Sequence, residues 1–412
     1  MPSNQSTDSP PSTLRALPRF DFRVQYAGGS DIGLVRSNNE DVWLIDASSA
    51  LFITCDGMGG HADGEVAAQL ASEAFAEAMR SRGARRALDA FLAAPTLASR
   101  AMVRQALRTA ALAANARVFE ESQRRADIMG CTLDAVLLLG EQAFVAHLGD
   151  SRVYLGRGPV TSQLTHDHSY YYAMLARGTL SPSTTQPVPD PLVNAVGLAP
   201  DAHVELLSVD LSRGDRLLLC TDGIHGAFRS SVELGKLLRT GTPDDAVHAL
   251  IAAADEAGGR DNATAIVIEI AERFVTRPTG DDSWKTLDQA SLRNSALFAR
   301  LPPALVHRIA SSAAEVEIGA GELLPRQFAN ALVTYLVLEG QVKFADGRAF
   351  GPPALLYPES LAGGTRDGAL AVVDRPLRAL RWRSDDFRDH CTADPAVALL
   401  LYERLARLLA RG

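Results

Sequence analysis

The strongest constraint on how this chain folds is an acidic residue that recurs where an aliphatic strand emerges. The strands L-F-I-T-C, V-A-H-L-G and L-L-L-C-T each run into aspartate followed by glycine or serine. Another aspartate, followed by asparagine, comes directly before T-A-I-V-I, and an acidic pair follows Arg36. The acidic positions are Glu40, Asp41, Asp56, Asp150, Asp222 and Asp261. A carboxylate buried at such a point is costly unless a partner neutralises it, and hard divalent cations suit carboxylate and carbonyl oxygens best.

A single Asp-Gly is most often only the start of a turn. Repetition of the same context along one chain favours a shared metal site instead. Histidine is almost absent around these positions, which argues against zinc and for magnesium or manganese. Two such ions close together would lower the pKa of a bridging water and make it nucleophilic.

Composition leaves room for two folded units and argues against nucleic acid as a partner. The chain has 412 residues, 47% of them hydrophobic, and its net charge of −8 comes without basic clusters. Its cysteines stand singly without CxxC spacing, so we expect reduced core residues at Cys55, Cys131, Cys220 and Cys391. No apolar run approaches the roughly 20 residues of a membrane span, and the Ser- and Pro-rich start is typical of a disordered tail. We expect a soluble, cytoplasmic protein.

Hydrophobic periodicity predicts an α+β fold, in which antiparallel sheets are covered by helices. Short strands are expected at 42–45, 51–55, 135–139, 143–147, 153–155, 217–221 and 263–270, many of them separated by turn residues. Helices are expected at about 65–80, 97–124 and 243–257.

A polar, turn-prone stretch after Ile270 predicts a domain boundary. Beyond it the sequence predicts a helical segment at 297–309, strands at 335–338 and 342–344 around a turn at Glu339-Gly340, and a final helix that Asp394 caps and Pro395 begins. The expected domains are a tail at 1–21, a first domain at 22–272, a linker at 273–290 and a smaller domain at 291–412.

Six motifs, in order, resemble those of the metal-dependent type 2C serine/threonine protein phosphatases in their bacterial form. They are R-S-N-N-E-D from Arg36, D-G-M-G-G-H-A-D-G-E from Asp56, G-D-S-R from Gly149, L-T-H-D-H-S from Leu164, T-D-G from Thr221 and R-D-N-A-T from Arg260. The resemblance covers about residues 22–272. It implies an antiparallel β-sandwich flanked by helices, with a binuclear Mn²⁺ or Mg²⁺ centre that acts on phosphoserine and phosphothreonine in proteins.

The resemblance also implies a role for each matching residue. Asp56 would bridge both ions and the Gly57 carbonyl would ligate one of them, while Asp222 and Asp261 would complete the other. Glu40 and Asp41 would hold waters of the ions, Asp150 would serve a third, weaker ion, and Arg36 would grip the substrate phosphate with its fork of donors. Because no Cys or Ser in these motifs is paired with a base, we expect direct in-line attack by the bridging water.

Two features leave alternatives open. Animal members place a proposed acid, histidine, two residues after the bridging aspartate, where this chain has Met58; His61 further along either donates a proton or supports the loop. Residues 170–191 correspond to a flap that varies among bacterial members, and Tyr170, Tyr171 and Tyr172 belong either to a mobile substrate loop or to a packed surface loop.

The C-terminal domain resembles the β-roll of cyclic-nucleotide-binding domains through Gly321-Glu322, Y-L-V-L-E-G-Q-V and the last helix. In that family a Gly-Glu pair binds ribose and a later arginine binds the cyclic phosphate. Here Pro358-Glu359 replaces Gly-Glu, and Arg366 follows after a shortened gap. We therefore favour a degenerate sensor or protein-docking module over a working nucleotide site.

Three functions from different classes remain to be compared. The first is an active phosphatase that opposes bacterial Ser/Thr kinases and acts on their phosphorylated protein substrates. The second is a catalytically weak regulatory protein that uses the fold to bind a partner. The third, a two-metal nuclease, predicts basic groove residues that the sequence lacks.

Overall fold

The chain forms two compact units, which are described one at a time. The computed structural model describes residues 13–59, 63–158, 160–176 and 190–274, and within 291–410 all except 293, 300, 302–305, 307–308, 311–312, 329–330, 365–369, 385–386 and 388–394. Among these residues, the first unit takes in the chain to residue 169 together with 192–206 and 210–274. The second takes in 170–176, 190–191, 207–209 and the part beyond 291.

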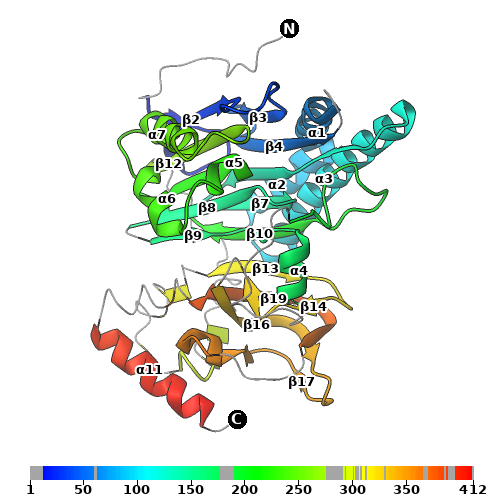
Figure 1. Ribbon diagram of the computed structural model, residues 1–412. Coiled ribbons are helices and arrows are strands. Elements are labelled where there is room, and N and C mark those ends of the chain that lie inside the picture. The colour runs from blue at the N-terminus through cyan, green and yellow to red at the C-terminus, as the bar shows by residue number, and fades with distance from the viewer. Residues whose placement is uncertain are drawn as a thin grey trace. The chain divides into compact units, whose positions relative to one another are not determined.

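Two antiparallel sheets form the centre of the first unit (Figure 1). One sheet has the strand order β1 (Arg15–Ala16), β2 (Phe22–Asp31), β12 (Ala263–Arg273), β11 (Arg216–Cys220), β8 (Arg152–Arg157) and β9 (Val160–Gln163). The other places β7 (Gln142–Leu148), β6 (Leu133–Leu139), β4 (Leu51–Gly59) and β3 (Asp41–Asp46) side by side, and β5 (Met129–Cys131) pairs with the end of β4. The strand β10 spans Glu205–Asp210. The predicted antiparallel sheets are thus confirmed.

The two sheets pack face to face through apolar side chains. Tyr26 on β2 meets Phe52 on β4 edge to face, with ring centroids 5.4 Å apart. Gly28 on β2 has the indole of Trp43 against it, and a Cβ there would lie 2.7 Å from that ring. A side chain at position 28 would therefore push the sheets apart.

Helices cover the outer faces of the sandwich (Figure 1). The helices α1 (Asp63–Met79), α2 (Arg82–Ala93) and α3 (Leu97–Arg125) share a buried apolar cluster with β3 to β7, and α5 (Asp222–His225), α6 (Ser231–Leu238) and α7 (Pro243–Glu256) share another with β2, β8, β11 and β12. The three predicted helices are confirmed as α1, α3 and α7. No helix among the described residues combines the length and hydropathy needed to cross a bilayer.

The sequence analysis missed α2, although its signal is readable. Ser81 caps this helix by accepting a hydrogen bond from the Ala84 amide. Its buried residues, Ala84, Ala87, Leu88 and Phe91, follow helical spacing, so periodicity alone could have identified it.

Ordered structure begins before residue 22, so the predicted tail at 1–21 was too long. Arg15–Ala16 pairs with β2, and Leu17 and Phe20 are buried, with Phe20 5.6 Å from the ring of Phe22. Burial of the apolar residues in L-R-A-L-P-R-F stabilises this segment, because in a disordered tail they would stay exposed to water. Residues 1–12, and 275–290 within the predicted linker, lie outside the described part of the chain.

The second unit is built on two long antiparallel strands, β16 (Ala331–Lys343) and β19 (Ala371–Arg383), with β13 (Ala314–Ile318) beside β19. Short strands pair with them: β14 (Leu323–Leu324), β15 (Gln327–Phe328), β17 (Ala349–Phe350) and β18 (Leu355–Leu356). A 3-10 helix η1 (Pro358–Ala362) and the helix α11 (Pro395–Leu409) also belong to this unit, and α4 (Tyr170–Ala176) is grouped with it. Asp394 and Arg366 lie outside the described residues.

The predicted turn at Glu339-Gly340 is wrong, because β16 runs through it as one strand. Gly340 has a positive φ of 87°, and the register against β19 shifts on either side of Glu339. A Cβ at Gly340 would lie 2.2 Å from the Pro376 carbonyl oxygen. The glycine therefore forms an irregularity within a strand where its sequence context suggested a hairpin.

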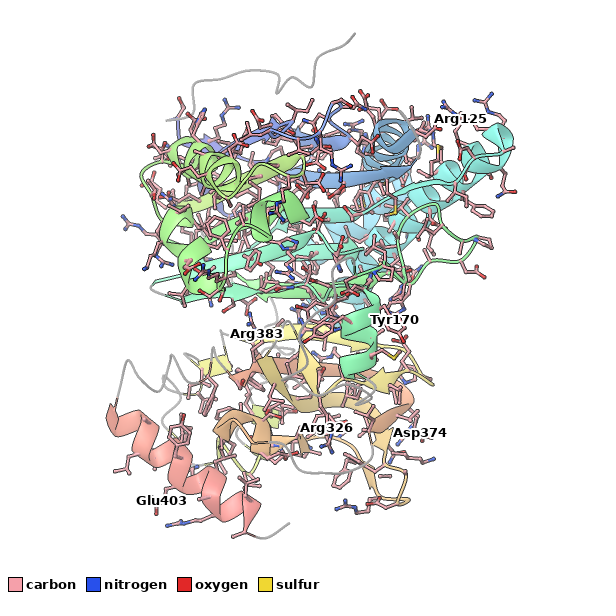
Figure 2. All side chains as sticks on the ribbon, viewed as in Figure 1. Arg125, Tyr170, Arg326, Asp374, Arg383 and Glu403 are labelled. Atoms are coloured by element: carbon pink, nitrogen blue, oxygen red, sulfur yellow. The ribbon has the colours of Figure 1, made fainter. Side chains whose placement is uncertain are left out.

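Cys55, Cys131 and Cys220 are buried with free thiols, as predicted, and Cys391 lies outside the described residues. Arg125, in the last turn of α3, forms an ion pair of 2.7 Å with Asp63 in the first turn of α1 (Figure 2). This contact fixes the start of α1.

Candidate metal centre

The acidic residues that the sequence singled out meet around one pocket of about 320 Å³. Its lining consists of Arg36, Glu40, Asp56, Gly57, Met58, Gly59, Thr132, Asp150, Leu192, Asp222, Asp261 and Asn262. Of the predicted site residues only Asp41 is missing from this lining; it is fully buried and lies opposite Asp56 in the register of β3 and β4. Five strand or helix ends far apart in the sequence thus bring their carboxylates together.

Thr132 holds Asp56 in place. The Asp56 amide donates to Thr132 Oγ1 at 2.8 Å, and the Thr132 amide donates to the Asp56 carbonyl at 2.9 Å. The same hydroxyl shares a hydrogen bond of 2.7 Å with Ser151 Oγ. One buried threonine therefore connects the strand that carries Asp56 to the turn that carries Asp150.

Gly57 sits where the backbone approaches another segment closely. Its amide donates to the Glu40 carbonyl at 3.2 Å. A Cβ on Gly57 would lie 2.2 Å from the Gly64 carbonyl oxygen and 2.6 Å from that of Glu40. Only glycine allows this approach, which keeps the backbone beside Asp56 open to the pocket.

Asn262 and Thr221 organise the opposite wall. Asn262 accepts a hydrogen bond from the Glu40 amide at 2.9 Å and donates to the carbonyls of Ile32 and Asn38. Thr221 Oγ1 donates to Asp41 Oδ2 at 2.8 Å and accepts from the Thr264 amide. Side chains next to Asp222 and Asp261 thereby fix the segment that carries the acidic pair.

Arg36 comes from the loop between β2 and β3 and reaches Asp261. Its Nη2 lies 2.7 Å from Asp261 Oδ2, and about half of its side chain is exposed. It is the only cationic side chain among the residues that line the pocket in the described structure. One guanidinium therefore faces five carboxyl groups, and their ionised forms would carry more negative charge than it can balance.

The carboxyl groups are held in a state that resists ionisation. Burial raises the pKa of Asp41 and of Asp150 to about 7. Burial, and then the neighbouring carboxylates, raises the pKa of Asp56 well above its ordinary value, and burial and Asp261 raise that of Asp222. Asp222 Oδ1 is buried without a hydrogen-bond partner among the described residues. Such groups gain most from a cation that compensates their charge.

The donor set fits hard divalent cations. The pocket offers carboxylate oxygens and open backbone beside Gly57, and no histidine or cysteine is among the described residues lining it. Oxygen donors without nitrogen or sulfur are the preference of magnesium and manganese, whereas zinc favours histidine and cysteine. The arrangement can hold cations and, through Arg36, a phosphate beside them.

The sequence analysis gave no role to several residues that build this site. Thr132 and Leu192 carry no signal of their own, because their importance comes from tertiary hydrogen bonds and packing. Thr221 and Asn262 stand next to predicted ligands, and their position in T-D-G and R-D-N-A-T was a signal that went unused. Met58 lines the pocket, and His61 lies outside the described residues.

The predicted flap is described only in part. Tyr170–Ala176 forms α4, in which Tyr171 and Tyr172 are buried and Tyr170 is half exposed. This burial favours the packed alternative for the tyrosines. Residues 177–189 lie outside the described part of the chain.

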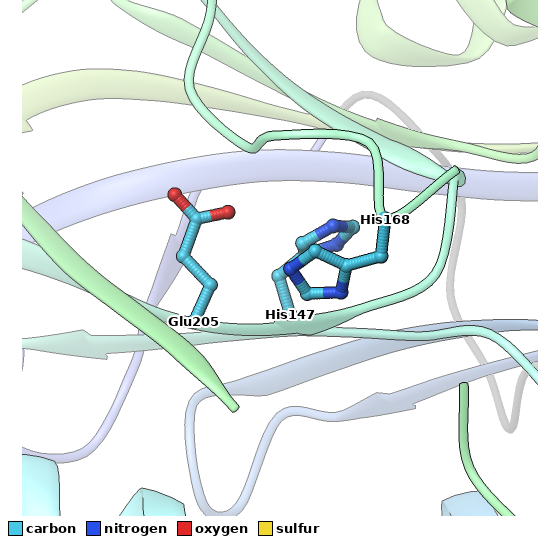
Figure 3. A group of neighbouring side chains, drawn as sticks. All are labelled: His147, His168 and Glu205. Atoms are coloured by element: carbon cyan, nitrogen blue, oxygen red, sulfur yellow. The ribbon is translucent and has the colours of Figure 1, made fainter. Parts of the chain in front are cut away.

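A second polar cluster lies beside the turn that carries Asp150 (Figure 3). His147, His168 and Glu205 place one nitrogen or oxygen atom each within 4.8 Å of one another. Three of the four ring nitrogens have hydrogen-bond partners in the described structure: His147 contacts Asp134 at 2.7 Å and the His166 carbonyl at 2.8 Å. His168 Nδ1 accepts from the Gly149 amide and from Asn194. A cation would have to displace these bonds, so we interpret the cluster as a support for the Asp150 turn.

His147 and Asp134 form a buried ion pair within this cluster. Burial opposes the charge on His147, but Asp134 outweighs it and raises the pKa of the imidazole to about 9. Burial raises the pKa of Asp134 although His147 acts in the opposite direction. The histidine is therefore protonated at neutral pH and donates from both ring nitrogens.

Comparison with known proteins places this geometry in a family. The sequence profile of protein phosphatase 2C matches residues 35–255. The serine/threonine protein phosphatase PstP of Mycobacterium tuberculosis is 31% identical over 296 residues, which cover 69% of this chain and 54% of the relative. This chain thus matches about half the length of that protein. The serine/threonine phosphatase stp of Listeria monocytogenes is 30% identical over 248 residues, which cover 58% of this chain and 93% of the relative.

Solved structures show the same likeness. A crystal structure of the Mycobacterium tuberculosis phosphatase PstP/Ppp is 30% identical, covers 60% of this chain and 99% of its own, and superposes with a TM-score of 0.52. A structure of the catalytic domain of PstP in complex with two manganese ions, also 30% identical, covers 60% of this chain and 99% of its own with a TM-score of 0.50.

Proposed function

This chain belongs to the protein phosphatase 2C family, and from that premise we propose that it hydrolyses phosphoserine and phosphothreonine esters in proteins. The observation that carries the proposal is the convergence of Glu40, Asp56, Asp150, Asp222 and Asp261 on one pocket that Arg36 also lines. The described lining offers no histidine or cysteine that would favour a zinc site instead. The relatives named above are serine/threonine phosphatases.

Each carboxylate has a proposed task. Asp56, the Gly57 carbonyl, Asp222 and Asp261 would hold two Mn²⁺ or Mg²⁺ ions, and Asp150 a third, weaker one. Glu40 and Asp41 would position waters, which is consistent with Asp41 standing behind the pocket lining. Two bound cations of this kind lower the pKa of water and compensate charge on phosphate oxygens.

Arg36 is the proposed phosphate-binding residue. Its guanidinium lies at the pocket and is half exposed, so its remaining donors can meet a phosphate that enters from solvent. A planar fork of N–H donors matches two phosphate oxygens at once. This contact orients the ester for attack from the side opposite the leaving serine or threonine oxygen.

Water is the proposed nucleophile. No serine or cysteine is among the described residues that line the pocket, and the Thr132 hydroxyl is hydrogen-bonded to the Asp56 amide and to Ser151. Because the carboxylates would hold the cations, none of these lining side chains is left to form a phosphoenzyme. Met58 has no proton to give to the leaving group. The proton would then come from water within the site.

Two finer assignments belong to the same proposal. We place the enzyme in the cytoplasm, opposite bacterial Ser/Thr kinases, because phosphorylated proteins are the substrates that its chemistry requires. The alternative of a catalytically weak partner-binding protein is not favoured, since the chain has all of these carboxylates, five lining the pocket and Asp41 buried behind them.

We propose that the C-terminal unit is a sensor or docking module that resembles a cyclic-nucleotide-binding domain without its ligand site. Pro358 begins η1 and lacks the N–H that a glycine would offer to a ligand. The residue before it, Tyr357, has a positive φ of 56°. Titration of the full chain with cyclic AMP and cyclic GMP in a calorimeter tests this assignment; saturable heat with either nucleotide would contradict it.

Phosphate release from a phosphothreonine peptide tests the main proposal. We expect activity with manganese, none with a chelator, and a loss of at least 100-fold in Asp222→Ala, because a ligand carboxylate is removed. Asp244→Ala, at a partly exposed position on α7, is a matched control for the loss of one aspartate. Activity that ignored both the chelator and Asp222→Ala would remove the metal-based function.

A further inference from the structure

The loop that carries Arg36 exposes two large apolar side chains. Leu34 is 71% exposed and Val35 is 67% exposed, and Val35 directly precedes Arg36. A single exposed leucine needs no explanation, because apolar atoms make up much of any protein surface. Two adjacent ones beside a residue of the catalytic pocket do call for a reason.

This loop is held by its backbone. The amides of Leu34 and Val35 both donate to the Gly259 carbonyl, at 2.7 and 3.1 Å. Gly33 has a φ of 77°, and a Cβ there would lie 2.4 Å from the Asp261 carbonyl oxygen. The two side chains are thus held outward by the turn that also carries Asp261.

A second loop repeats the arrangement. Leu192 lines the catalytic pocket, and the next residue, Val193, is 54% exposed. The Val193 amide donates to the His168 carbonyl at 2.8 Å, so this backbone is also fixed. Each loop therefore places one residue in the pocket and an uncharged, branched aliphatic side chain immediately next to it.

Given the proposed function, we propose that Leu34, Val35 and Val193 form an apolar rim that selects phosphoprotein substrates with an aliphatic or aromatic side chain next to the phosphorylated residue. A substrate that places its phosphate in the pocket must lay its neighbouring residues over whatever borders that pocket. A large apolar neighbour would remove surface of these side chains from water, whereas a small polar neighbour would leave it exposed. The rim is already ordered, so little loop entropy is lost on binding.

The charges around the pocket do not oppose this selectivity. Five carboxylates line it, and the rim residues carry no charge that could attract an acidic or a basic neighbour. A charged side chain beside the phosphoresidue would meet no opposite charge on the rim, and the proposed cations would offset the carboxylates of the pocket. Discrimination therefore rests on apolar contact.

Two phosphothreonine peptides that differ only at the residues flanking the phosphothreonine, leucine in one and serine in the other, test this proposal. We expect the wild-type enzyme with manganese to prefer the leucine peptide in kcat/KM by roughly fivefold, the ratio given by covering about half a leucine side chain. In the double variant Leu34→Ser/Val35→Ser this ratio should fall to between one and two. The ratio does not depend on the fraction of folded enzyme, because one preparation acts on both peptides.

Val232→Ser is the matched control, since Val232 is 63% exposed on α6 and lines no part of the pocket. It should keep the wild-type ratio. The proposed rim would be contradicted by a wild-type ratio near one. It would also be contradicted if the preference survived in the double variant or if the ratio fell equally in Val232→Ser. Failure of the wild-type enzyme to hydrolyse both peptides and p-nitrophenyl phosphate would instead overturn the proposed function on which the rim depends.

Discussion

Replacing Asp41 by asparagine should stabilise the protein when divalent cations are removed. Asp41 is fully buried and accepts a hydrogen bond of 2.8 Å from Thr221, which an asparagine oxygen can also accept. Burial raises the pKa of Asp41 from 3.8 to about 7. Ionising it in the folded protein is therefore unfavourable, and asparagine avoids that cost.

The size and the pH range of the effect follow from the shifted pKa. Below about pH 4 the carboxyl is protonated in the folded and the unfolded states, so it imposes no cost. Between about pH 4 and 7 only the unfolded state ionises, and folding becomes less favourable until the cost levels off above pH 7. A shift of about three units corresponds to at most about 4 kcal/mol, and we expect about 2 kcal/mol because the nearby carboxylates share the repulsion.

Urea unfolding in a chelator at pH 8 and at pH 4.5 measures this change. Asp41→Asn should raise the free energy of unfolding by about 2 kcal/mol at pH 8 and by about a quarter of that at pH 4.5. Asp46→Asn, on the same strand, should lower the free energy of unfolding at pH 8. Burial favours the neutral form of Asp46, but hydrogen bonds from Ser48 and Arg80 outweigh it and lower its pKa, so its loss should cost about 1 kcal/mol. A destabilised Asp41→Asn at pH 8 would refute the reasoning.

Three further changes test other parts of the site. Thr132→Val removes the acceptor of the Asp56 amide and should lower the free energy of unfolding by about 2 kcal/mol in urea titrations, whereas exposed Thr109→Val should change it little. Gly57→Ala should weaken manganese binding in calorimetry more than tenfold, because the new methyl meets the Gly64 carbonyl, while Gly83→Ala, whose nearest neighbour would be 3.9 Å away, should leave it unchanged. Because Asp134 raises the pKa of His147 to about 9, stability from this pair is full below about pH 6.5 and is lost as pH rises to 9; we expect a decline of up to about 3 kcal/mol that is absent in His147→Asn.

The convergence of the acidic residues could be predicted because they repeat in one context. Asp56, Asp150 and Asp222 each follow an aliphatic strand, and strand ends on the same side of a sandwich converge whatever the details of packing. The ordered motifs between residues 36 and 264 then resembled those of one phosphatase family, which predicted the family of this chain. Hydrophobic periodicity, which is likewise a local pattern, predicted the antiparallel sheets and the helices α1, α3 and α7.

What the sequence did not reveal depends on contacts between distant residues. Thr132 matters through the Asp56 amide, 76 positions away, and no local pattern marks it. Gly340 was expected in a turn, but the approach of Pro376 makes it an irregularity inside β16. The order at Leu17 and Phe20 likewise comes from a core that the rest of the chain supplies.

An anomalous difference map from a crystal grown with manganese tests the central claim most directly. Two peaks in the pocket, bounded by the oxygens of Asp56, Asp222 and Asp261, are the predicted result. A map with no peak among these carboxylates, recorded while the same crystals bind manganese elsewhere, would contradict the account.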